Sequence, residues 1–173
     1  GGLAALCVFA ATVIAQDAFP SIAITIVVPF PPGGSADTVA RLVGKRLSEL
    51  MAQPVVIDNR AGAGTVVGAT HVAKAPADGY TLLLSSGSTF TANPAIRPKL
   101  SYDPLKSFDP IGIVARIPLI VLANNDVPVN TVKEFVAAIK AAPEKYSYAS
   151  FGSGTTSHFT AEIVLQAVGA KLM

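Results

Sequence analysis

Cysteine, tryptophan and charged residues are scarce in this 173-residue chain, which has one cysteine, no tryptophan and 14% charged residues. With Cys7 as its only thiol, the sequence can form neither an internal disulfide nor a zinc site built from cysteines. The charged share lies below the roughly 25% of an average globular protein. Combined with 51% hydrophobic residues, it excludes a disordered chain and a coiled coil. A net charge of +2 is too small to indicate nucleic acid or an anionic membrane surface as a partner.

Basic residues are absent before Arg41. Residues 3–15 form an apolar run rich in small side chains, which is too short for a bilayer-spanning helix of about 20 residues. Its length fits the apolar region of a secretory signal, with Val13 and Ala15 at the −3 and −1 positions of a cleavage site. Because a basic start and an initiating methionine are missing, we expect residues 1–18 to be a partial signal peptide. A buried N-terminal helix or strand is the alternative.

From residue 22 onward, apolar runs alternate with helical patterns. Strands are predicted over residues 22–28, 54–57 and 80–84. Between the first two, apolar side chains at helical spacing predict a helix that ends near residue 51, with Ser35 or Asp37 as its N-cap. A short helix through Val67 and Val72 is predicted before the third strand.

A loop-rich segment with prolines at 94, 98, 104 and 110 separates this unit from a second one. There, residues 111–123 predict one or two strands divided at Pro118, and Thr131 to Glu134 form a capping box that opens a helix. Residues 146–150 predict another strand, which precedes a last helix through Phe159 and Val168.

This order of elements predicts an α/β fold of parallel sheets with helices on both faces. We expect residues 19–105 to form the N-terminal part of domain 1. Residues 106–173 would form the first, incomplete part of domain 2, because no strand follows the last helix to complete that unit.

Four loops follow predicted strands, at the edge where ligands bind in open α/β sheets. The first, residues 29–37, has paired glycines and a helix start, whose amides favour an anion. Residues 85–91 and 150–158 are dense in hydroxyls and glycines and lack acids, lysine and arginine. Such donors hold a carboxylate without the desolvation cost of a buried cation. Each loop alone could be a solvent-exposed turn, but four together favour a binding cleft.

The remaining loop, residues 58–68, contains a Gly-x-Gly-x-x-x-Gly pattern after a strand and so resembles a dinucleotide fingerprint. That motif also needs an acid at the end of the following strand, and residues 84–87 supply none. We therefore expect no nucleotide here, and we predict that Asp58 and Arg60 order the loop as an ion pair.

Catalysis and metal binding have little support. The residues around Ser153 lack the Gly-x-Ser-x-Gly spacing of a nucleophile elbow. His71 falls in an apolar helical stretch, which predicts that it packs or makes a local hydrogen bond. No histidine pair or carboxylate cluster marks a metal site. We expect neither an enzyme nor a cofactor. The alternative is an α/β enzyme, either serine hydrolase-like or nucleotide-dependent.

Several motifs occur in the order known from one protein family. They are IVVPFPPGGSAD at 26–37, QPVVIDNRAGAG at 53–64, DGYTLLL at 78–84 and YASFGSGTTSH at 148–158. Together they resemble the Bug family, the extracytoplasmic substrate-binding receptors of tripartite tricarboxylate transporters. The similarity covers roughly residues 19–173.

This resemblance implies a type II-like periplasmic binding protein whose two doubly wound domains close on a small organic acid without catalysis. Its partners would be that acid and membrane transporter subunits, with no nucleic acid, and the full-length protein would be a periplasmic monomer. The resemblance maps ligand contacts, some of them through ordered water, onto Phe30, Gly33, Gly34, Ser35, Asp37, Ser86, Gly87, Ser88, Thr89, Ser150, Gly152, Ser153, Gly154, Thr155, Thr156, Ser157 and His158.

Full-length relatives continue into a second half that completes domain 2, so the resemblance also implies a C-terminal truncation. A receptor that reports carboxylates to a sensor kinase is a further alternative. The sequence does not separate it from uptake, because the same ligand-closed form would serve both.

Overall fold

A computed structural model describes residues 18–172, and the expected signal peptide lies almost wholly outside them. Three parallel strands form one sheet in the order β2-β1-β3. They are β1 (Ile24–Val28), β2 (Val55–Asn59) and β3 (Thr81–Leu83). The first strand lies in the middle and pairs on both sides, which explains its nearly continuous apolar run. All three predicted strands of this unit are confirmed.

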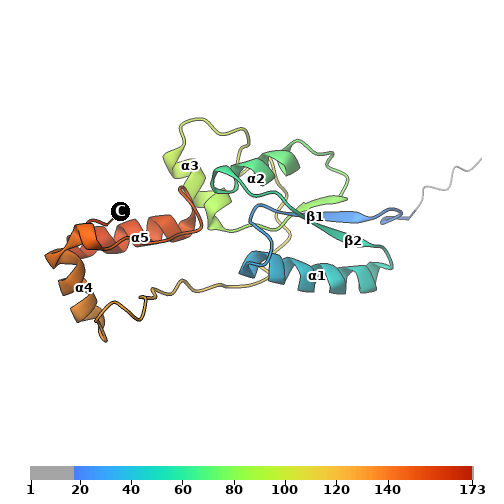
Figure 1. The fold of residues 1–173 in the computed structure, drawn as a ribbon. Coiled ribbons are helices and arrows are strands. Elements are labelled where there is room, and N and C mark those ends of the chain that lie inside the picture. The colour runs from blue at the N-terminus through green and yellow to red at the C-terminus, as the bar shows by residue number, and fades with distance from the viewer. Residues whose placement is uncertain (1–17, 173) are drawn as a thin grey trace, which may run out of the picture.

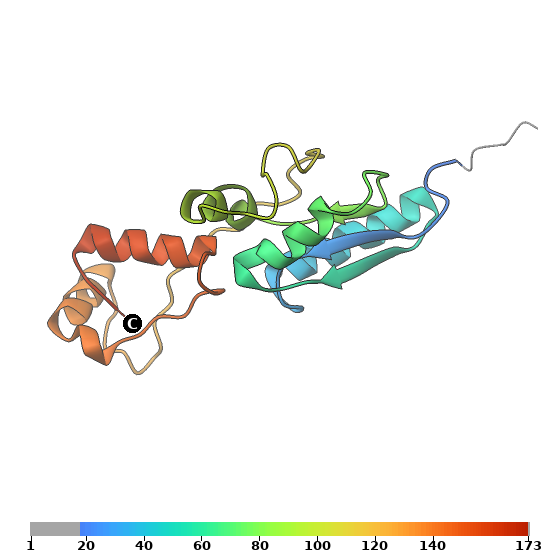
Figure 2. The same ribbon diagram turned by 90° about the horizontal axis from the view of Figure 1, so that it is seen from above.

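Two helices cover the opposite faces of this sheet, as Figures 1 and 2 show. They are α1 (Ser35–Met51) and α2 (Val66–Ala73). The main core lies under α1, where Ile26, Val28 and Ala40 are buried together. This helix lies close to the sheet, because a Cβ added at Gly44 would come within 3.0 Å of the Ile57 side chain.

The start of α1 differs from the prediction. Its N-cap is Gly34, with extended backbone and no side-chain cap, and not Ser35 or Asp37. Asp37 lies in the third helical position instead, and its carboxylate reaches back to accept the N–H of Gly33. An acid at this position satisfies an amide before the helix and complements the positive end of the helix dipole.

The rest of the described chain contains further helices joined by turns and irregular segments. These are the 3-10 helix η1 (Ala63–Thr65), the π-helix η2 (Ser88–Ala92), α3 (Asn93–Ile96), α4 (Val132–Ala141), the 3-10 helix η3 (Pro143–Lys145) and α5 (Thr156–Val168). Helices α4 and α5 lie to one side of the sheet, and the first turn of α5 points toward η2 (Figure 1). Within residues 18–172, no helix has the length and apolarity needed to cross a membrane.

The strands predicted over residues 111–123 and 146–150 are absent from the described chain, and both segments are irregular. Residues 111–123 are also all exposed, including Ile111 at 85% and Leu122 at 85%. A strand needs a neighbouring strand to satisfy its amides and carbonyls. No described residues pair with either segment, so apolar character alone does not make them strands here.

The capping box at the start of α4 is confirmed. Thr131 Oγ1 accepts the N–H of Glu134 at 3.2 Å, and Glu134 Oε2 accepts the N–H groups of Thr131 and Asn130 at 3.2 and 2.7 Å. Three amides that a helix start would otherwise leave to water therefore have protein partners.

Replacing Thr131 with alanine is expected to lower the free energy of unfolding by about 1 kcal/mol, because the hydroxyl acceptor of the cap is lost. Urea unfolding of the full-length protein measures this. Thr131→Ser keeps the hydroxyl and is the matched control, which we expect to stay close to wild type. Equal midpoints for the alanine and serine variants would contradict the role of the cap.

Candidate functional site

The loops that follow β1, β2 and β3 meet at the carboxyl edge of the sheet, because all three strands are parallel. The loop at residues 150–157, far away in sequence, joins them. Its Thr156 N–H donates to Ser88 Oγ at 3.0 Å, and an added Cβ at Gly64 would lie 2.8 Å from Ser153 O. The structure thus brings together parts of three predicted loops, which are the second loop (residues 58–68), the third loop (residues 85–91) and the fourth loop (residues 150–158).

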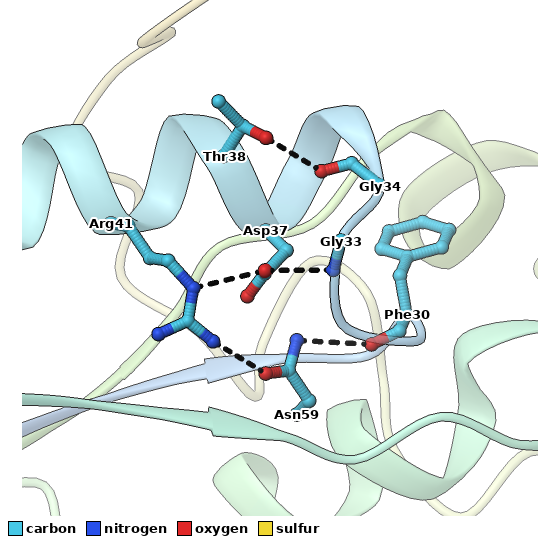
Figure 3. A network of polar contacts seen from close by, with 7 residues as sticks. All are labelled: Phe30, Gly33, Gly34, Asp37, Thr38, Arg41 and Asn59. Carbon is cyan, nitrogen blue, oxygen red and sulfur yellow. Dashed lines mark hydrogen bonds and ion pairs between the residues drawn. The ribbon is translucent and has the colours of Figure 1, made fainter.

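The loop after β1 is held by a polar network around Asp37 (Figure 3). The Asp37 carboxylate accepts the Gly33 N–H at 2.9 Å and Arg41 Nε at 3.0 Å. Arg41 Nη2 donates to Asn59 Oδ1 at 3.4 Å, and Asn59 Nδ2 donates to the carbonyl of Phe30 at 3.2 Å. Both ends of the loop are therefore tied to the same cluster of side chains.

Burial separates the roles of these first-loop residues. Asp37 is only 4% exposed, and its Oδ1 has no partner among the described residues. The Gly34 carbonyl accepts both the N–H and the hydroxyl of Thr38. In contrast, Ser35 is exposed, and its hydroxyl makes no hydrogen bond to the described chain. Gly34 and Ser35 thus offer donors to solvent or a ligand, while Asp37 holds the loop.

The hydrogen bond from Arg41, followed by that from the Gly33 amide, lowers the pKa of Asp37 from 3.8 to about 2. A carboxyl whose pKa is lower in the folded state stabilises the fold while it is ionised. That stabilisation is complete above about pH 4 and is lost as the pH falls toward 2.

Asp37→Asn is therefore expected to be less stable than wild type at pH 6, with the difference shrinking as the pH falls from 4 to about 2. Urea unfolding of both proteins across this range measures the difference. Asp109→Asn is the control, because Asp109 is an exposed acid outside the network. A gap between Asp37→Asn and wild type that stays constant with pH would argue against this ion pair.

The loop after β3 is organised around the buried Thr89. Its Oγ1 lies 2.7 Å from Thr65 Oγ1 and 2.6 Å from Ser85 Oγ, and its carbonyl accepts the Tyr102 hydroxyl at 2.8 Å. Burial raises the pKa of Tyr102, so this hydroxyl remains a donor. Ser88 is also fully buried. Ser86 and Gly87 are half-buried and remain closer to the surface.

The loop before α5 is built by Thr155, the buried N-cap of that helix. Its hydroxyl donates to the Gly152 carbonyl at 2.7 Å and accepts the N–H of His158 at 3.5 Å. Ser157 Oγ accepts the N–H of Phe151 at 3.1 Å, which folds the loop back on the helix. Gly152 stays exposed, and the buried His158 Nδ1 has no partner among the described residues.

Several residues that build the site were missed by sequence reasoning. Asn59, Thr65 and Asn93 bond to loop backbone or to loop hydroxyls, and Arg41 bonds to the Asp37 carboxylate. Asn59 stands at the end of β2, where strand-end reasoning would place a site residue. Asn93 precedes a proline in a loop-rich segment and has the sequence character of an ordinary turn residue.

Two further expectations have clear outcomes. Arg60 Nε lies 2.6 Å from Asp58 Oδ2, which confirms the predicted ion pair. For His71, the sequence predicts either packing or a local hydrogen bond, and the packing alternative is wrong because the residue is exposed on the last turn of α2. It lies on the solvent side because the small residues Gly68 and Ala69 form the face of α2 that is buried. Within residues 18–172, no three histidine, cysteine or acidic side chains gather as a metal site would require.

The chain matches one protein family and several of its individual members in sequence. The family described as tripartite tricarboxylate transporter family receptor matches residues 39–173. Protein BugT of Bordetella pertussis is 36% identical over 176 residues, covering 98% of this chain and 54% of that protein.

Solved structures give the same result. Rpa4515 of R. palustris with adipate has a TM-score of 0.86 and 34% identity, covering 90% of this chain and 52% of that one. MatC of Rhodopseudomonas palustris with bound malate has a TM-score of 0.81 and 33% identity, covering 90% and 53%. The periplasmic binding protein BugD has a TM-score of 0.77 and 33% identity, covering 90% of this chain and 52% of that one. Together these neighbours confirm the α/β fold of a periplasmic solute-binding protein, and the chain spans about half the length of the relatives it matches. The chain belongs to the tripartite tricarboxylate transporter receptor family, whose matched members include Bug proteins.

Proposed function

We propose that this protein is an extracytoplasmic receptor that captures a small organic carboxylate and delivers it to a tripartite tricarboxylate-type transporter. One observation carries the proposal: uncharged amides and hydroxyls from four loops gather at the carboxyl edge of a parallel sheet. Aligned neutral donors suit a carboxylate. Two relatives whose structures contain adipate and malate support this ligand class.

The predicted site residues divide into two proposed roles. Those near the surface contact the acid directly or through water, namely Phe30, Gly34, Ser35, Ser86, Gly87, Ser150, Gly152, Ser153, Thr156, Ser157 and His158. The buried residues, together with Gly33, whose N–H is bonded to Asp37, hold the loops in place. These are Gly33, Asp37, Ser88, Thr89, Gly154 and Thr155. In this proposal the ligand lies between a domain at residues 19–105 and another that begins at residue 106.

Binding without turnover is the expected behaviour. A ligand at 100 times its Kd stabilises the folded state by about 2.7 kcal/mol, which raises the melting temperature by roughly 5–10 °C for a domain of 150–250 residues. Thermal-shift screening of the full-length protein against dicarboxylates, tricarboxylates, aromatic acids and amino acids measures this. We expect at least one acid to raise the melting temperature by several degrees.

The same screen tests the enzyme alternative. A covalent burst with a serine-reactive probe, or turnover of the stabilising compound, would overturn the receptor proposal. So would a complete lack of response across the acids. Ester and amide analogues of the stabilising acid are the matched controls, and we expect them to give no shift because they lack the carboxylate.

A further inference from the structure

Asn93 lies where loops of the candidate site contact one another. No sequence motif marks this residue as part of the site. The residue is fully buried at the start of α3. Its Nδ2 donates to the Gly64 carbonyl at 2.6 Å and to the Ser88 carbonyl at 2.7 Å, with Thr65 Oγ1 at 3.3 Å. Its Oδ1 accepts Arg97 Nε at 2.9 Å. Both N–H groups of this amide, and one acceptor site of its oxygen, are therefore directed at the protein.

The turn that Asn93 holds has a strained backbone. Its four residues, from Gly62 to Thr65, all have positive φ, including 47° at Ala63 and 86° at Thr65. A β-branched residue in this region is a true outlier, and such backbone persists only where surrounding contacts hold it. Arg97 supplies a second contact, because its Nη2 donates to the Ala63 carbonyl at 3.2 Å. The Asn93–Arg97 pair thus binds two consecutive carbonyls of the turn.

The fourth loop packs against the same pair. A Cβ added at Gly154 would lie 3.4 Å from Asn93 Oδ1 and 3.5 Å from Arg97 Nη2. Ser88, whose carbonyl binds Asn93, also receives the Thr156 N–H on its hydroxyl. Asn93 therefore lies directly beside three loops. They are the loop after β2, the loop after β3 and the loop at residues 150–158.

We infer that Asn93, supported by Arg97, is a positioning residue that sets the spacing of these three loops and so the length of acid that fits between them. The inference rests on the proposed function, because it takes these loops as the carboxylate site. Asn93 is too deeply buried to touch the ligand. Its loss should alter both the affinity and the preference among acids of different length.

The test compares wild type with Asn93→Ala and Arg97→Gln at full length. Calorimetric titration with succinate, glutarate and adipate, below the melting temperature of each variant, gives three Kd values. We expect at least about a 10-fold loss of affinity for the preferred acid, because the loops must be ordered on binding, and a flatter preference among the three acids. Arg97→Gln spares the Asn93 donors and guards against an Asn93 variant that fails to fold.

Hydrogen exchange provides a readout that needs no ligand. We expect peptides covering residues 62–66, 86–91 and 150–157 to exchange faster together in both variants, with α1 unchanged. Asn124→Ala is the control, because Asn124 is exposed and its side chain caps only a local turn at Asp126.

Each failure has its own signature. Variants that melt earlier but keep wild-type Kd values and selectivity would show a purely structural role and overturn the inference. Unchanged exchange in the three loops would overturn it as well. If wild type itself binds no acid in the wider thermal-shift screen, the proposed function fails first.

Discussion

The Gly68→Val substitution is expected to lower the free energy of unfolding by about 3 kcal/mol, which is at the upper end of the usual cost of overpacking. Gly68 lies in α2 at the point where this helix crosses the end of β1. A Cβ there would lie 2.8 Å from the Cβ of Pro29 and 2.9 Å from the carbonyl of Arg60. Neither neighbour can rotate away, because one is a proline ring and the other is backbone. The helix must therefore move off the sheet.

Thermal melting of the full-length protein measures this effect as a fall of roughly 6–12 °C. Gly112→Val is the matched control, because an added Cβ at Gly112 has nothing within 4 Å. We expect that control to stay within about 0.5 kcal/mol of wild type, as exposed substitutions usually do. Equal losses at the two positions would show that α2 does not depend on close approach to β1.

The Gly64→Ala variant is expected to separate the fourth loop from the other loops. Left-handed backbone at φ 65° costs an alanine about 1–2 kcal/mol. In addition, its Cβ would lie 2.8 Å from the carbonyl oxygen of Ser153 and 3.3 Å from the carbonyl carbon of Gly154. Because both are backbone atoms, one loop must move, and this adds about 1–3 kcal/mol.

The Gly33→Ala variant separates the cost of the left-handed backbone from the cost of the close contact made by the added Cβ. Gly33 has a similar φ of 85°, but an added Cβ there has nothing within 4 Å. We expect urea unfolding to show a larger loss for Gly64→Ala than for Gly33→Ala, and hydrogen exchange to rise at residues 150–157 only in the former. If the two variants behave alike, the contact between the second and fourth loops carries no stability.

Much of the first unit, and the start of α4 in the second, could be predicted from the sequence, because each of these signals has a local cause. Residues 24–28 are β-branched and apolar as a strand covered on both faces requires, and Thr131 with Glu134 form their cap within four residues. The predictions of strands at residues 111–123 and 146–150 are wrong because a strand needs a neighbouring strand to pair with, and an apolar run does not reveal whether one is present.

The loops of the site could be predicted as well, because glycines and hydroxyls after a strand have a physical meaning of their own. The direction in which each side chain points could not be predicted from the sequence. Ser88, Thr89 and Thr155 look like ligand donors in sequence. However, the hydroxyls of Ser88 and Thr89 bond to other loops, and that of Thr155 bonds within its own loop. Asn93 could not be identified for the same reason, since the partners of its Nδ2 lie 5 to 29 positions away along the chain.

Residues 85–91 and 150–158 contain no acid, lysine or arginine, and under the proposed function this has a consequence for how ligand binding depends on salt. Attraction between a ligand and a fixed cation is screened by dissolved ions, over about 10 Å at 0.1 M salt. Dipoles of amides and hydroxyls act at contact distance, where mobile ions do not intervene. A carboxylate held by these loops would therefore bind almost equally well in fresh and in saline surroundings.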